Sequence, residues 1–327
     1  MSPISPRLRR MALYAAALAT LPYVVVKLMW LGGSELGMTG REGAEEMSGT
    51  RFVVGNVLTV VLMAAALAFL VALTRPWARR VPARLVFVLG AGATGLLAPI
   101  LLGLPLGIAV QLVIEGSVKP DDDTGLAPWV FGVVYSGFGL LAVAMAILVA
   151  AYVVDRWGRL LTQPPPRPSS PATLAGALGL LSFGAAMIYW GVAGPGTTGP
   201  QGMDQPAQRT VLAATGAMSI AALVVPLLGD RARRWPRTAW LVTWTGACVC
   251  TLQAPTQILL AQGGDVRPGL ALIALVATPG SCFYGLAVLR RHLSTAAQEP
   301  SGRQGMLQIS SNERYGGRQE PHASIPR

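Results

Sequence analysis

Long apolar runs separated by short polar gaps dominate the chain. The runs span roughly residues 12–32, 52–73, 85–108, 129–153, 173–193, 210–228, 239–261 and 269–289. A helix rising about 1.5 Å per residue needs about 20 residues to cross a bilayer core about 30 Å thick. Helices satisfy their own backbone hydrogen bonds in lipid, and the runs lack the alternating polarity of barrel strands. The pattern therefore predicts an all-α polytopic membrane bundle with eight transmembrane helices.

Composition and charge support this prediction and orient the chain. Hydrophobic residues make up 52% of the 327 residues and charged residues only 13%, against about 25% in soluble proteins. One set of gaps carries 20 of the 26 basic residues with five acids, and the alternate gaps carry five basic residues with ten acids. Because basic loops stay cytoplasmic, we expect a multi-pass protein of the cell membrane with both termini in the cytoplasm. The net charge of +11 then indicates contact with anionic lipid, and not with nucleic acid.

The N-terminus also resembles a signal peptide. Arginines 7, 9 and 10 precede an apolar stretch in which Ala17-Leu18-Ala19 could be a cleavage site. The apolar run continues to Trp30, however, which is long for a signal peptide. We expect an uncleaved first helix; cleavage would leave seven helices in the same orientation.

Three similarities indicate an internal repeat. The sequence ARRVP at 78–82 is matched by ARRWP at 232–236, Ala98-Pro99 by Ala254-Pro255, and Trp30 by Trp190, at offsets of 154, 156 and 160 residues. Four helices per copy predict two parallel repeats. The domains would be a first repeat at 1–160, a proline-rich cytoplasmic linker at 161–172, a second repeat at 173–292 and a disordered cytoplasmic tail at 293–327.

Lys27 is the charged residue inside an apolar run. Its side chain could snorkel to the outer interface, which Trp30 would mark, as Trp190 would in the second repeat. It could instead form a buried structural pair, or line a polar cavity that binds an anionic group or carries a proton. The matching position of the second repeat is Met187.

A second candidate site surrounds a proline in the seventh run. Gln253 and Gln257 lie four residues apart, on one helical face, with Pro255 between them. A proline removes one helical hydrogen bond, and Pro99 should likewise free the carbonyl of Gly95. Interrupted helices in matching positions of two repeats indicate a transporter site, although such residues also serve packing. Gln111 is a lesser polar position near a helix end.

Other chemistry has little support in the sequence. The two histidines, His292 and His322, lie on the cytoplasmic side, which excludes haem or zinc held by histidines inside the membrane. Cys248 and Cys250 point to nearly opposite sides of a helix, so we expect no disulfide between them. The acids at 121–123, with Glu115, could bind a cation but are typical of a solvated loop. We therefore predict no cofactor, no metal site and no catalytic residue.

The first run, with Lys27-Leu-Met-Trp30-Leu-Gly-Gly after Leu21-Pro22-Tyr23, resembles the opening of uncharacterised multi-pass membrane proteins of actinobacteria. The resemblance covers some 20 residues and implies topology only. Two hypotheses of function follow from the residues. The protein is a transporter or permease-like protein with a polar site for a small molecule between its repeats, or a non-catalytic membrane scaffold or accessory subunit that binds a protein partner through its loops or tail.

Overall fold

The computed structural model describes residues 5–39, 49–118, 126–168, 170–259, 261 and 266–315. Its long helices are α1 (Pro6–Leu31), α3 (Thr50–Thr74), α4 (Ala83–Ala98), α5 (Leu104–Glu115), α6 (Pro128–Trp157), α7 (Pro171–Ala193), α8 (Pro206–Leu227), α9 (Pro236–Leu259) and α10 (Pro268–Tyr315). The shorter helical turns are η1 (Pro76–Arg80), η2 (Pro99–Gly103), η4 (Leu160–Thr162) and η5 (Gly229–Arg234). These elements confirm the predicted all-α helical bundle.

Seven helical stretches in the described residues are long and apolar enough to cross a membrane. They are Pro6–Leu31, Phe52–Thr74, Ala83–Glu115, Pro128–Trp157, Thr173–Ala193, Pro206–Leu227 and Pro268–Ser294. They correspond to seven of the eight predicted segments and identify an integral membrane protein. The remaining segment forms α9, whose threonines, tryptophans and glutamines lower its hydropathy. A crossing by α9 stays a prediction.

The gaps between the helices gather at two opposite ends of the bundle. Contacts between distant residues define each end. At the basic end, Arg9 is 2.6 Å from Asp155, and the Trp240 indole donates to the Gln163 carbonyl at 2.9 Å. At the opposite end, the Ala127 amide donates to the Gly37 carbonyl at 2.8 Å, and Arg267 donates to the Gly199 carbonyl at 2.8 Å. The described parts of the basic gaps and the described flanks of the alternate gaps thus lie at opposite ends, as the charge pattern predicts.

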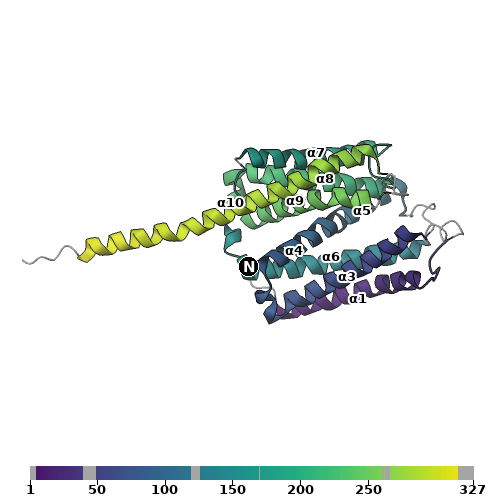
Figure 1. The fold of residues 1–327 in the computed structure, drawn as a ribbon, viewed down its shortest axis with the longest axis horizontal. Coiled ribbons are helices and arrows are strands. Elements are labelled where there is room, and N and C mark those ends of the chain that lie inside the picture. The colour runs from purple at the N-terminus through teal and green to yellow at the C-terminus, as the bar shows by residue number, and fades with distance from the viewer. Residues whose placement is uncertain are drawn as a thin grey trace, which may run out of the picture.

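The helices form two groups joined by α4 and α5 (Figure 1). In the first group α1 packs on α3 and α6, and in the second α7 packs on α8 and α10 while α9 packs on α8 and α10. Each group has its own apolar core, one containing Leu70 and Leu141 and the other Leu180 and Phe183. The contacts of α4 with α9 and of α5 with α8 hold the groups together.

Two elements depart from regular or expected helices. The π-helical turn η2 begins at Pro99 and joins α4 to α5, where the sequence predicted a break. In contrast, α9 continues through Pro255 as an α-helix.

The tail also differs from the prediction, which was disorder from residue 293. Instead α10 continues to Tyr315 and projects from the bundle (Figure 1). Adding residues to an existing helix costs much less than starting a new one, which gives a physical reason for this continuation. Residues 316–327 of the predicted tail lie outside the described ranges.

Candidate functional site

The side chain of Lys27 lies on α1 about one turn before the helix ends and is directed at α3. Its Nζ donates a hydrogen bond of 2.7 Å to Oδ1 of Asn56. Three aromatic rings surround the ammonium, with centroids 5.5 Å away for Tyr23, 4.6 Å for Trp30 and 5.6 Å for Phe52. A cation over an aromatic face gains about 0.5–2 kcal/mol, depending on desolvation. We call Lys27, Asn56 and these three rings the lysine cage.

Hydrogen-bond donors outnumber acceptors in the lysine cage. Asn56 is 2% exposed, and its Nδ2 has no partner among the described residues. The nearby Thr59 hydroxyl donates to the backbone carbonyls of Gly55 and Asn56, and it also interacts with the Tyr23 hydroxyl. The cage therefore presents an ammonium and an amide nitrogen, and its side-chain acceptors are the Asn56 oxygen, which the ammonium uses, and the Tyr23 hydroxyl.

This arrangement bears on the three interpretations of Lys27. The lysine is half-buried, and its partner is a neutral amide on the neighbouring helix. The geometry is therefore that of a pair between α1 and α3, and the partner supplies no compensating negative charge.

Gln253 lies where the two groups of helices meet. Its Nε2 donates a 2.9 Å hydrogen bond to the carbonyl of Gly95 on α4. Pro99, four residues after Gly95, has no N–H to give that carbonyl, so Gln253 replaces the missing helical bond. The helices are close here, because a Cβ at position 95 would overlap the Cys248 carbonyl. We call this α4–α9 contact the seam.

An aromatic contact extends the seam toward the start of α4. The rings of Phe87 and Trp244 lie edge to face with centroids 4.7 Å apart. The Trp244 indole nitrogen also lies 3.4 Å from the Thr94 hydroxyl, as a long hydrogen bond. Polar and aromatic side chains therefore link the two groups along much of α4.

The predicted polar residues do not converge on one site. Gln257 is half-buried on α9, one turn beyond Gln253. Gln111 is 2% exposed on α5 and donates to Oε2 of Glu115 at 2.9 Å, within the same helix. Lys27 lies between α1 and α3. The candidates thus occupy the cage, the seam and α5, and the acids at 121–123 lie outside the described residues.

Trp30 and Trp190, predicted as interface anchors, both lie near the ends of their helices but face protein. They are 7% and 3% exposed. The indole of Trp30 donates to the Leu36 carbonyl at 2.8 Å, and that of Trp190 to the Thr198 hydroxyl at 3.2 Å. Each indole therefore fixes the connection that follows its helix, which is a role different from contact with lipid.

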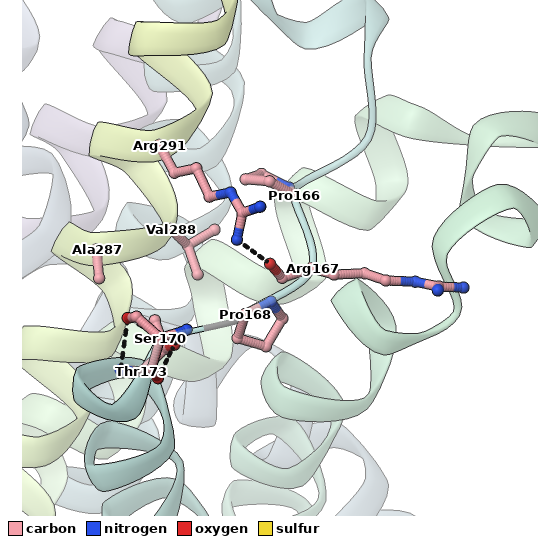
Figure 2. A pocket seen from close by; sticks show the side chains of 8 residues that line it. All are labelled: Pro166, Arg167, Pro168, Ser170, Thr173, Ala287, Val288 and Arg291. Carbon is pink, nitrogen blue, oxygen red and sulfur yellow. Dashed lines mark hydrogen bonds between the residues drawn. The ribbon is translucent and has the colours of Figure 1, made fainter.

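A cavity of about 290 Å³ lies at the basic end, beside the linker between the two groups (Figure 2). Arg291 of α10 donates to the Arg167 carbonyl at 2.9 Å across it, while the Arg167 side chain points away (Figure 2). The side chains of Ser170 and Thr173 form the capping box that starts α7. The visible polar groups thus hold the linker to the second group, and the sequence did not indicate this cavity.

The sequence analysis did not predict the pairing of Asn56 with Lys27. One signal could have found it: Lys27 lies four residues before the end of α1, and Asn56 lies six residues after the start of α3. Consecutive membrane helices run antiparallel, so the two residues are at similar depths.

Comparisons of the chain with protein-family models, with curated proteins and with solved structures gave no match.

Proposed function

We propose that the protein crosses the membrane eight times as two parallel four-helix repeats and works as a transporter or permease-like protein, with the seam as its moving contact. The observation that carries this proposal is the interrupted helix at Pro99. The proline leaves the Gly95 carbonyl without its helical donor, and Gln253 from the other repeat donates to that carbonyl. Interrupted helices at the interface between repeats are a recurring feature of transporters, and π-helical turns occur frequently at functional sites.

Packing supports a crossing by α9. Its 24 residues span about 36 Å at 1.5 Å per residue, which is longer than a bilayer core. It packs on α4, α8 and α10, and Ala239, Val249 and Ala254 on it are fully buried. A helix enclosed by other helices can carry threonine and glutamine, because these side chains face protein and not lipid.

Matching burial in the first helix of each proposed repeat supports the duplication. At the offset of 160 residues, four buried positions of α1 coincide with buried positions of α7. The pairs are Ala16 and Gly176, Thr20 and Leu180, Tyr23 and Phe183, and Trp30 and Trp190. The shared face, together with the two indole hydrogen bonds, favours a common origin of the helices.

The fourth helices match in the same way. At an offset of 140 residues, buried positions of α6 coincide with buried positions of α10. The pairs are Val130 and Leu270, Gly137 and Ala277, Leu141 and Ser281, Ala144 and Tyr284, Leu148 and Val288, and Tyr152 and His292. A Cβ on Gly137 would lie 2.9 Å from the Ala19 carbonyl, while one on Gly179 would lie 3.2 Å from the Ala277 carbonyl, so the matching helices also touch at matching points.

Labelling of a cysteine in the seam tests the proposal without knowledge of a substrate. In a background with Cys248, Cys250 and Cys282 replaced by alanine, Leu252→Cys is placed beside Gly95. Alternating access exposes the seam to water from both sides. Leu252→Cys should therefore react with a charged, membrane-impermeant maleimide applied to right-side-out vesicles and to inside-out vesicles.

Leu180→Cys is the matched control, because Leu180 is fully buried in the second core, away from the seam, and should not react. Equal protection of both cysteines would contradict a moving seam and would favour the accessory-protein hypothesis.

A further inference from the structure

We propose that the lysine cage binds an oxyanion, either a carboxylate or a phosphate, between α1 and α3. This inference is independent of transport, because it concerns binding within one group of helices. It begins from the charge of Lys27. The described residues contain two ion pairs, Arg9 with Asp155 and Arg233 with Asp230, and Lys27 belongs to neither. The rings and the Asn56 oxygen supply partial negative charge only.

The second observation is the unpartnered Nδ2 of Asn56, in a side chain that is 98% buried. A buried donor without an acceptor destabilises the folded protein, because its lost hydration is not replaced. The ammonium of Lys27 has three N–H groups, of which Asn56 accepts one. The two side chains therefore offer adjacent N–H donors and one positive charge, a set that suits an acceptor with two or more oxygens.

The aromatic rings of the lysine cage make the surroundings of the bound group apolar. Tyr23 and Trp30 are buried, and the rings of Trp30 and Phe52 lie 5.7 Å apart. Low polarity around a cation strengthens its attraction for an anion. Carboxylates and phosphates share this chemistry, and the group can come from a dissolved solute or from the headgroup of an anionic lipid.

The chain offers a direct spectroscopic test, because Lys27 and Lys119 are its two lysines. Full-length protein with Lys119→Arg and with ¹³C,¹⁵N-labelled lysine gives one lysine Cε–Nζ signal, that of Lys27. The protein is placed in phosphatidylcholine nanodiscs and titrated with acetate and with phosphate, with chloride at equal ionic strength as control. We expect a saturable shift of the signal with an oxyanion, no shift with chloride, and loss of the response in Asn56→Leu.

Two further arms identify the source of the oxyanion. A shift on adding phosphatidylglycerol to the nanodiscs, without a response to dissolved anions, assigns a lipid headgroup. Asn56→Asp supplies a carboxylate in place of the amide; it should raise the melting temperature in buffer without oxyanions and abolish the response, and it covers the case in which Asn56→Leu fails to fold. A Lys27 signal that responds to neither anions nor anionic lipid would overturn the proposal. So would a signal that changes only when Glu42, Glu45 and Glu46 are replaced by glutamine, since the acceptor would then belong to the chain itself.

Discussion

Three side chains, those of Gln253, Trp30 and Trp190, each donate a hydrogen bond to a group outside their own helix. Gln253 caps the Gly95 carbonyl, and the indoles of Trp30 and Trp190 hold the connections that follow their helices. In an apolar environment a polar atom without a hydrogen bond raises the free energy of the folded state, so these partners stabilise the positions of whole helices. The sequence singled out Gln253 as a polar residue beside Pro255 and the two tryptophans as interface anchors, but it could not give their partners.

Removing the indole N–H tests this role at the residue scale. Trp30→Phe and Trp190→Phe each keep an aromatic ring but leave a loop acceptor without its donor. Each should lower the free energy of unfolding by about 1 kcal/mol, the usual net value of one hydrogen bond. Thermal unfolding of the purified protein measures the effect, with Trp77→Phe as control because Trp77 is 49% exposed. An equal effect of all three substitutions would show that ring size, and not the hydrogen bond, is responsible.

At the scale of elements, the apolar runs predicted helices well because length and hydropathy together decide whether a segment can cross lipid. Pro99 predicted the break between α4 and α5 because a proline removes one backbone donor. Pro255 was expected to interrupt its helix in the same way, yet α9 is α-helical on both sides of it, without a π-helical turn. The sequence alone did not distinguish the two prolines. The sequence also could not show that Lys27 and Gln253 lie in different interfaces, one between α1 and α3 and the other between α4 and α9.

A double-mutant cycle tests the coupling between Pro99 and Gln253. Gln253→Leu leaves the Gly95 carbonyl unpaired in the seam and should destabilise the protein by about 1–3 kcal/mol. Pro99→Ala returns an N–H to position 99, which can donate to the same carbonyl. In the Pro99→Ala background, Gln253→Leu should therefore cost much less, as measured by thermal or denaturant unfolding. Additive effects of the two substitutions would contradict the coupling.

At the scale of the whole molecule, the alternation of charge between successive gaps of the sequence corresponds to two opposite ends of the bundle. This was predictable because each crossing moves the chain to the opposite side of the membrane. The sequence also indicated matching halves, and the parallel repeats stay a proposal. The packing of α4 on α9 and of α5 on α8 could not be predicted, since it depends on the fit of side chains between helices far apart in the sequence.

Reporter fusions on either side of α9 test the central claim of eight crossings most directly. Alkaline phosphatase, active outside the cytoplasm, and green fluorescent protein, fluorescent inside it, are fused in turn after Arg234 and after Gly264. Eight crossings predict fluorescence after Arg234 and phosphatase activity after Gly264, because α9 carries the chain across. The same reporter active at both positions would show that α9 does not cross, and would contradict both the eight-helix topology and the parallel repeats.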